Sequence, residues 1–155
     1  MNNNKSEWDK SYEKRDNFVF YPHEEVIRFV SKFIRKRVGV TEFMDVAPNS
    51  VEGRVLDLGC GIGRHVVYCH EMGLEAYGVD LSDAAVTVAR HWGERQGLPN
   101  SEDRVRQGDV RQLPWGDGFF RYAISHGVLD SMPFDIARAA CLELARVMPV
   151  GGLFY

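Results

Sequence analysis

Residues 55–64 read Val-Leu-Asp-Leu-Gly-Cys-Gly-Ile-Gly-Arg, a short apolar run that ends in three glycines at alternate positions. An acid, Asp57, stands two residues before the first of these glycines. Residues 76–80 form a second apolar run, which ends in Asp80. A glycine-rich turn after one strand and an acid at the end of the next strand are typical of a Rossmann-type sheet that binds a nucleoside. The two runs therefore predict a nucleoside-binding α/β fold.

Strand and helix patterns alternate along residues 54–155. We expect strands at 54–58, 75–79, 103–107, 122–125 and from 153 onward, and helices at 64–72, 82–96 and 134–148. Ser82 is a favourable N-cap for the second of these helices. Alternation with short connections predicts right-handed crossovers. The fold class is therefore α/β, a Rossmann-like doubly wound, mainly parallel sheet of five strands with the order 3-2-1-4-5.

The residues that precede this alternating part form an N-terminal helical extension. Apolar side chains at 26, 29, 30, 33 and 34 recur at helical spacing, and Gly39 is the expected stop. We expect a second short helix at 41–46, a loop at 49–53 and a frayed terminus over residues 1–6. Residues 1–50 are thus expected to be a cover with helices and residues 51–155 the nucleoside-binding core, within one structural domain.

Composition limits the classes of protein to consider. The chain has 155 residues, of which 45% are hydrophobic and 26% charged, and this mixture is typical of one soluble globular domain. The net charge of −3 gives no reason to expect a nucleic-acid partner. No apolar run reaches the length of a membrane span, and residues 1–6 do not resemble a signal peptide. The three cysteines are an odd number without paired spacing, which favours a reducing, cytoplasmic location.

The spacing of the glycines narrows the choice of nucleoside. A dinucleotide site typically has Gly-x-Gly-x-x-Gly, whereas Arg64 stands where the third glycine of that motif would be. An acid at Asp57 suits a cationic group better than a pyrophosphate. S-adenosylmethionine carries an ammonium, a sulfonium and a ribose but no phosphate, and Asp80 could accept the ribose hydroxyls. A nicotinamide-dependent oxidoreductase is a less favoured alternative.

The sequence resembles the class I S-adenosylmethionine-dependent methyltransferases in five stretches that occur in the family's order. These stretches are residues 55–63, 78–82, 107–115, 119–129 and 143–152. Together they cover most of residues 53–155, which makes the resemblance far more specific than one glycine motif. It implies S-adenosylmethionine as the cofactor, with S-adenosylhomocysteine as the product.

The resemblance also implies a set of site residues. Gly59, Gly61 and Gly63 would line the methionine part, Asp57 would lie near its ammonium, and Asp80 would hold the ribose. Leu81 would pack on the adenine, Asp109 would accept its amino group, and Val110 would donate a main-chain N–H. Ser125 and His126 would border the sulfonium and the acceptor. Residues 8–22 resemble the N-terminal cover of small-molecule methyltransferases, in which Trp8, Tyr12 and Tyr21 form either a lid or part of the core.

The implied reaction is an in-line methyl transfer to a small-molecule acceptor, for which positioning and exclusion of water matter most. His126 is the candidate general base, although it could instead order its loop or contact the donor. No metal is expected, because His65 and His70 lie five apart on one helix and match no zinc signature. The alternative function is a module that binds the donor or its product without a complete acceptor site.

The resemblance implies a seven-stranded sheet, whereas this sequence stops within the fifth strand. Residues 153–155 would then form an apolar sheet edge, which favours pairing with another chain. Three interpretations stay open: the chain is truncated from a longer protein, a second copy covers the edge as a homodimer, or the N-terminal segment covers it.

Overall fold

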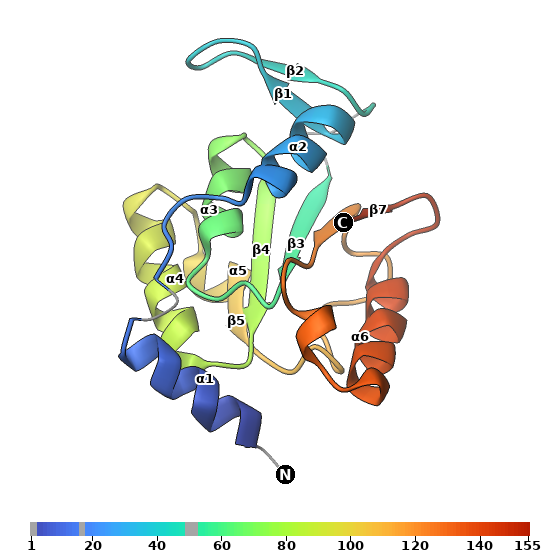
Figure 1. Ribbon diagram of the computed structural model, residues 1–155. Helices are drawn as coiled ribbons and strands as arrows, with labels where there is room; N and C mark the ends of the chain where they lie inside the picture. The colour runs from blue at the N-terminus through green and yellow to red at the C-terminus, as the bar shows by residue number, and fades with distance from the viewer. Residues whose placement is uncertain (1–2, 16–17, 49–52) are drawn as a thin grey trace.

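The computed structural model of the chain describes residues 3–15, 18–48 and 53–155. Five helices form the N-terminal extension and flank the sheet, and a sixth, very short helix precedes β5 (Figure 1). The elements in chain order are α1 (Asn3–Glu13), α2 (Glu24–Phe33), β1 (Arg35–Arg37), β2 (Phe43–Asp45), β3 (Arg54–Leu58), α3 (Arg64–Glu71), β4 (Glu75–Asp80), α4 (Asp83–Arg95), α5 (Ser101–Arg104), β5 (Val105–Gln107), β6 (Tyr122–Ile124), the 3-10 helix η2 (Leu129–Ser131), α6 (Phe134–Val147) and β7 (Leu153–Phe154).

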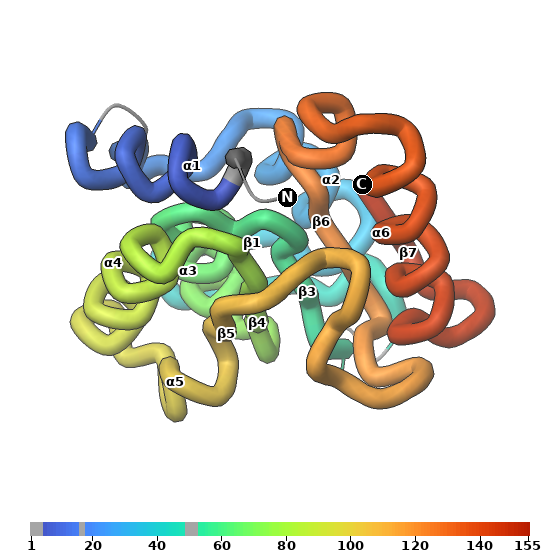
Figure 2. Tube along the Cα trace, turned by 90° about the horizontal axis from the view of Figure 1, so that it is seen from below, coloured from blue at the N-terminus to red at the C-terminus, as the bar shows by residue number. Residues whose placement is uncertain are grey.

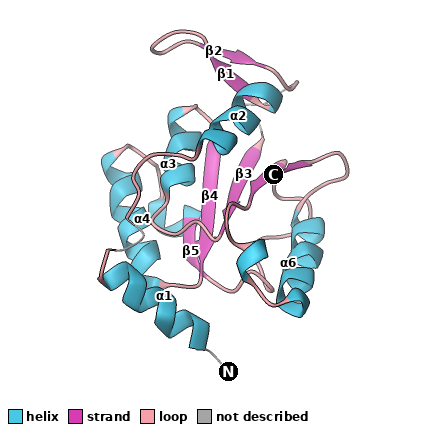
Figure 3. Cartoon of the chain, viewed as in Figure 1, coloured by secondary structure: helices cyan, strands magenta, loops and turns pink. Residues whose placement is uncertain are grey.

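The main sheet has five parallel strands in the order β5-β4-β3-β6-β7. Figure 3 shows β5, β4 and β3 of this sheet side by side. Counted along the chain, this is the expected order 3-2-1-4-5, and the expected fold class is confirmed. In the register, Asp57 of β3 lies between Gly78 of β4 and Ile124 of β6. The strand order reverses beside β3, and in open α/β sheets ligands bind outside the carboxyl ends of the strands at such a reversal.

Two hydrophobic clusters fill the two faces of this sheet. Val55 belongs to the cluster under α2, α3 and α4, while Leu56 and Leu58 belong to the cluster under α6. Because side chains alternate along a strand, Asp57 points to the same face as Val55, toward α3. Burial on both faces explains why β3 is apolar at nearly every position.

Local signals fix the starts of the helices around the site. Ser82 caps α4 as expected, since its Oγ accepts a hydrogen bond from the main-chain N–H of Ala85 at 3.2 Å. His23 caps α2, because its Nδ1 accepts from the N–H of Glu25 at 3.3 Å. The sequence predicts the first of these caps but not the second, because histidine is not a common N-cap.

The expected helix at 41–46 is wrong. Arg35–Arg37 and Phe43–Asp45 form an antiparallel hairpin, so α2 ends at Phe33 and Gly39 lies in the hairpin turn rather than at a helix end. Cross-strand contacts stabilise this hairpin: Arg35 forms an ion pair with Asp45 at 2.7 Å, and its guanidinium lies 5.1 Å from the centre of the Phe43 ring. These partners are not adjacent in sequence, so local spacing does not reveal them.

Two other expectations about local structure need correction. Residues 101–104 form the short helix α5, so the third strand of the sheet is shorter than expected, Val105–Gln107. Helix α1 begins at Asn3, which corrects the frayed terminus over residues 3–6. The expected fraying of residues 1–2, the expected loop at 49–52 and the expected domain boundary at residue 50 lie outside the described residues.

Strand β7 lies at the edge of the sheet. Its Leu153 and Phe154 are exposed, and within the described part of the chain no strand pairs with its outer side. An apolar hollow of about 330 Å³ lies beside it, between β7 and the end of α6. No helix among residues 3–15, 18–48 and 53–155 is long and apolar enough to cross a membrane.

Candidate active site

A cavity of about 890 Å³ lies at the carboxyl ends of four strands. The segments after β3, β4, β5 and β6 each contribute to its wall, through residues such as Gly61, Asp80, Asp109 and His126. Figure 2 shows α1 beside α4, whereas the segment that follows β6 lies on the other side of the strand ends. The cavity therefore has a floor of strand ends and two opposed walls, as expected at the reversal of strand order.

The glycine turn brings main chain to the cavity surface. Gly59, Gly61 and Gly63 all have positive φ, at 73°, 52° and 88°. The N–H groups of Gly59 and Cys60 donate to the carbonyl of Val79 at 2.8 and 2.9 Å, which fixes the turn against β4. A Cβ on Gly61 would lie 2.7 Å from the hydroxyl of Tyr12, so only glycine allows the cover to approach this closely.

Asp80 lies beside this turn with both carboxylate oxygens in use. Oδ2 accepts from the N–H of Gly61 at 2.8 Å, and Oδ1 accepts from the N–H of Ser82 at 2.9 Å. Burial raises the pKa of Asp80, although these two main-chain donors oppose that effect. A carboxylate has about four acceptor positions, so Asp80 can still accept hydrogen bonds from a ligand.

Asp109 follows β5, the strand that pairs with β4, and contacts Arg111. The Nε of Arg111 donates to Oδ1 and Oδ2 of Asp109 at 2.9 and 3.0 Å, and its main-chain N–H donates to Oδ1 at 2.9 Å. Arg111 holds the pKa of Asp109 below its usual range. Arg111 also lines the cavity, although no sequence motif singles it out as a site residue.

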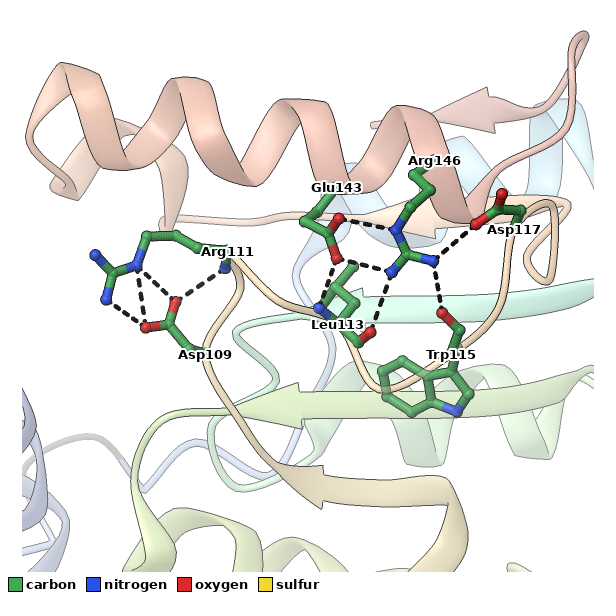
Figure 4. Close-up of polar contacts among 7 residues, drawn as sticks. All are labelled: Asp109, Arg111, Leu113, Trp115, Asp117, Glu143 and Arg146. Carbon is green, nitrogen blue, oxygen red and sulfur yellow. Dashed lines mark hydrogen bonds and ion pairs between the residues drawn. The ribbon is translucent and has the colours of Figure 1, made fainter.

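A network on α6 anchors the loop that carries Asp109 (Figure 4). Arg146 donates to the carbonyl oxygens of Trp115 and Leu113 at 2.9 and 3.1 Å and to Oδ1 of Asp117 at 3.0 Å. Glu143 accepts from Arg146 and from the N–H of Leu113, both at 2.8 Å. Two side chains of one helix thus satisfy main-chain groups of the loop and hold it against the sheet.

Asp57 is nearly inaccessible, at 3% exposure, and its Oδ2 has no hydrogen-bond partner among the described residues. Nδ1 of His65 lies 3.7 Å from this oxygen, which is too long for a hydrogen bond. Ser125 Oγ is likewise buried without a hydrogen-bond partner in the described part of the chain. A buried carboxylate oxygen without a partner is costly and indicates a group that binds there.

His126 follows β6 and lines the cavity. Its ring stacks on that of His23, with 4.0 Å between ring centres and an interplanar angle of 30°. Partial burial lowers the pKa of His126, and the neighbouring His23, His65 and Arg64 lower it further, against the opposite effect of Asp57. The imidazole is therefore neutral at pH 7 and able to accept a proton.

Helix α1 forms the wall over the glycine turn. Trp8 and Tyr12 line the cavity, and burial together with Asp80 raises the pKa of Tyr12, which stays a neutral phenol. Two polar contacts attach α1 to the start of α4: Ser82 donates to Asp9, and Lys5 forms an ion pair with Asp83 at 2.5 Å. Tyr21 is 71% exposed and is not among the described residues that line the cavity.

The structure thus brings most of the expected residues to one cavity. Those on its wall are Gly59, Gly61, Asp80, Leu81, Asp109, Val110, His126, Trp8 and Tyr12. Asp57 and the Oγ atom of Ser125 are buried and are not on the wall, and Gly63 packs on α4. His23 and His65, which no sequence motif singles out, contact the site. The hydrogen bond between them joins residues that are 42 apart, so it leaves no local signal. Within the described ranges, no group of three His, Cys, Asp or Glu side chains could hold a metal ion.

Cys60 is also at the wall, but its chemistry is unfavourable for a nucleophile. Burial raises the pKa of its thiol, and the nearby Asp80 and Asp57 raise it further. A thiol that stays protonated is a poor nucleophile. Cys60 therefore acts as a small side chain that fills the turn.

Comparison with known proteins gives a consistent result. A family model described as a methyltransferase domain matches residues 56–155. The uncharacterized methyltransferase YcgJ from Bacillus subtilis is 34% identical over 108 residues, which are 66% of this chain and 39% of that protein. The 2-heptyl-1-hydroxyquinolin-4(1H)-one methyltransferase of Mycobacteroides abscessus is 28% identical over 106 residues, 68% of this chain and 46% of that protein. The chain thus spans less than half the length of these relatives.

The fold has matching solved structures. One match is the crystal structure of a candidate S-adenosyl-L-methionine-dependent methyltransferase from Methanococcus maripaludis, with a TM-score of 0.69 and 22% identity. The alignment covers 100% of this chain and 66% of the Methanococcus chain. At this identity the likeness shows the fold. It extends over the N-terminal part of the chain as well as the sheet.

Proposed function

Because the chain belongs to the methyltransferase domain family of class I S-adenosylmethionine-dependent enzymes, we propose that its cavity binds S-adenosylmethionine and a small-molecule acceptor. The observation that carries the proposal is the set of polar groups that meet at the glycine turn. Asp57 Oδ2 is buried without a hydrogen-bond partner in the described part of the chain, and Asp80 keeps free acceptor positions. The unpartnered carboxylate of Asp57 fits an ammonium, and Asp80 beside the glycine turn fits a ribose. These residues therefore fit S-adenosylmethionine.

Each residue then has a defined role. Asp80 accepts hydrogen bonds from the ribose hydroxyls, and the glycine turn lies against the methionine part, with Asp57 and Ser125 behind it. Leu81, Asp109 and Val110 bind the adenine. When bound, S-adenosylmethionine supplies an electrophilic methyl group on a sulfonium. The chain contributes orientation and exclusion of water, the latter through Trp8 and Tyr12 of α1.

The side chains on the acceptor side of the cavity favour an apolar small molecule as the acceptor. The wall opposite α1 carries Val128, Met132, Pro133 and Ile136. The cavity of about 890 Å³ is near the upper end of the usual range for one drug-sized ligand, so it holds the donor with a small acceptor beside it. The relative from Mycobacteroides abscessus, which is named as a 2-heptyl-1-hydroxyquinolin-4(1H)-one methyltransferase, supports the same class.

His126 is the proposed general base for an acceptor whose O–H or N–H proton must leave. It is neutral and lies on the cavity wall, as a base requires. The net charge of −3 supports a small molecule rather than a nucleic acid as the acceptor. A cytoplasmic location stays a prediction from the cysteine content.

Calorimetric titration with S-adenosylhomocysteine tests the binding part of the proposal. We expect Asp80→Asn to weaken binding by about 10- to 100-fold, since it removes a charged acceptor from two hydroxyls. Asp103→Asn is the matched control, because Asp103 is an exposed acid away from the cavity. Absence of binding by the wild-type chain, or equal binding by Asp80→Asn, would refute the assignment.

A methylation assay with apolar hydroxylated acceptors separates an enzyme from a binding module. Transfer that falls on substitution of His126 by Gln supports the enzyme and its base. Tight binding of S-adenosylhomocysteine without transfer to any acceptor supports the alternative of a binding module.

A further inference from the structure

Three histidines from separate parts of the chain meet at one side of the cavity. His23 precedes α2, His65 lies in the first turn of α3, and His126 follows β6. The rings of His23 and His126 stack, and the ring of His65 stands at 90° to that of His126 with 5.8 Å between centres. Only His65 and His126 of the three line the cavity. The cluster therefore connects the N-terminal extension to the catalytic side of the sheet.

Hydrogen bonds hold His23 at both its ring and its main chain. Its Nδ1 accepts from the N–H of Glu25 at 3.3 Å, so a neutral ring carries its hydrogen on Nε2. Its own main-chain N–H donates to Nε2 of His65, also at 3.3 Å. The position and the plane of the His23 ring are thus set by contacts that do not involve His126.

A hydrogen bond fixes the tautomer that a neutral His65 ring adopts. Because its Nε2 accepts from His23, its hydrogen lies on Nδ1, which points toward Oδ2 of Asp57 at 3.7 Å. Protonation of Nε2 would place two donors against each other and break the contact with His23. His65 is therefore a support for His23 rather than a base.

His126 differs from the other two histidines. Among residues 3–15, 18–48 and 53–155, no hydrogen bond occupies either nitrogen of its ring. The stack on His23, with 4.0 Å between ring centres, is the closer of its two ring contacts, and the other is the edge contact with His65 at 5.8 Å. A ring with free nitrogens at a cavity wall is able to accept a proton from a ligand.

We propose that His23 is a positioning residue for His126, holding the ring of the candidate base in one plane at the acceptor side of the cavity. The proposal rests on the proposed function in that His126 takes the proton of the acceptor. In that step the acceptor O–H proton passes to a ring nitrogen of His126, the electron pair of the O–H bond stays on the acceptor oxygen, and the imidazolium later returns the proton to water.

The charges around His126 agree with this role. His23 from the segment before α2, and His65 and Arg64 from α3, all oppose a positive charge on His126, while Asp57 of β3 favours it. The two neighbouring imidazoles thus help to keep the base neutral at physiological pH. Removal of His23 should therefore alter both the orientation and the protonation of His126.

The first test is an NMR titration of the histidine rings, which needs neither donor nor acceptor. His23→Asn keeps an oxygen that can cap α2 but removes the stacked ring. We expect it to raise the pKa of His126 by about half a unit and to remove the ring-current shift of its ring protons. His91→Asn, on the exposed side of α4, is the matched control, and His126→Gln assigns the signal. An unchanged His126 titration and unchanged shifts in His23→Asn would overturn the proposal.

The second test uses His23→Phe, which keeps a flat ring and cannot carry charge. In a methylation assay at a pH where His126 is neutral, we expect His23→Asn to lose about tenfold in kcat, with the KM for S-adenosylmethionine unchanged. His23→Phe should stay within about threefold of the wild type, because the stack is retained. In both variants the acid limb of the pH profile should move to higher pH.

Equal losses of kcat in the two variants would indicate a merely structural role for His23. Complete absence of transfer would refute the proposed function, while the NMR titration would still decide the positioning role.

Discussion

Gly61 and Gly63 belong to the same turn and both have positive φ, yet their neighbours differ. A Cβ on Gly63 would lie 2.9 Å from Cβ and 3.2 Å from Cα of Ala89, in the packed contact between α3 and α4. A Cβ on Gly61 would meet the end of one side chain, that of Tyr12. One glycine therefore serves the packing of the fold and the other serves the approach of α1 to the cavity.

We predict that Gly63→Ala lowers the free energy of unfolding by about 2–4 kcal/mol, because a left-handed backbone and overpacking against main chain both cost stability. Gly61→Ala should cost only about 1 kcal/mol, since Tyr12 can move, but it should weaken binding of S-adenosylhomocysteine. Urea unfolding and calorimetry measure the two effects. Equal losses of stability would contradict the distinct roles of the two glycines.

At the level of single residues, the sequence singles out acids and glycines that lie at the cavity, but only one of the three histidines that meet there. Asp80 and the glycines are recognisable because their partners lie in the same motif or in the next strand. His23 and His65 are 42 residues apart, and only the folded chain brings them together. Asp57 lies in the predicted strand, but only the structure shows that its Oδ2 has no hydrogen-bond partner among the described residues.

At the level of elements, the contact between α6 and the loop after β5 is important for the site. Glu143 and Arg146 lie one turn apart on α6 and bind main-chain groups of Leu113 and Trp115 (Figure 4). The same loop carries Asp109 and Val110 at the cavity. Glu143 and Arg146 do not line the cavity themselves, but through this loop they support the proposed adenine site.

We predict that Glu143→Ala lowers the free energy of unfolding by about 2 kcal/mol, since the N–H of Leu113 loses a charged acceptor. Glu143→Gln should recover part of this loss, because an amide oxygen can still accept from the N–H. Urea unfolding of both variants provides the measurement, with Glu102→Ala, an exposed acid on α5, as the control. Identical losses in the Ala and Gln variants would argue against the hydrogen bond as the cause.

The elements that the sequence predicts correctly are those with a strong local period. Helices α3, α4 and α6 and strands β3, β4 and β6 lie within about two residues of their expected bounds. The β1–β2 hairpin is missed because Arg35, Arg37 and Phe43 pair across the turn rather than along it. The strand predicted at 103–107 loses its first residues to α5, where Asn100 in a left-handed conformation starts a short turn of helix.

At the level of the whole molecule, the open side of β7 is the main exposed apolar feature. Leu153, Phe154 and Tyr155 are exposed there, next to the hollow that Met148 and Pro149 line. Such an edge offers unpaired main-chain groups to another strand. A homodimer through this edge stays a prediction.

Sedimentation velocity over a hundredfold range of concentration tests that prediction. We expect a concentration-dependent dimer in the wild type and a monomer for Phe154→Lys, since a charged lysine at a sheet edge disfavours pairing. Phe134→Lys is the control, because Phe134 is an exposed aromatic at the start of α6, away from β7. A monomer at all concentrations in the wild type would exclude this interface.

The stability of the whole chain should fall in two steps as the pH decreases. The pKa of His126 is lowered in the folded chain, so just below pH 6.5 the unfolded chain binds more protons and the free energy of unfolding decreases with falling pH. Asp109 and Glu143 have lowered pKa values through Arg111 and Arg146, so the stability that they contribute is present above about pH 4 and is lost below it. Burial raises the pKa of Asp80, so protonation of Asp80 relieves a buried charge and its effect on the stability opposes that of Asp109 and Glu143.

Urea unfolding at pH 7.5, 6, 5 and 3.5 should therefore show two losses of stability as the pH falls. The loss at the higher pH should be absent in His126→Gln, whereas the loss at the lower pH should remain in His126→Gln. If both chains lose the same stability between pH 7.5 and 5, another group is responsible for the loss at the higher pH.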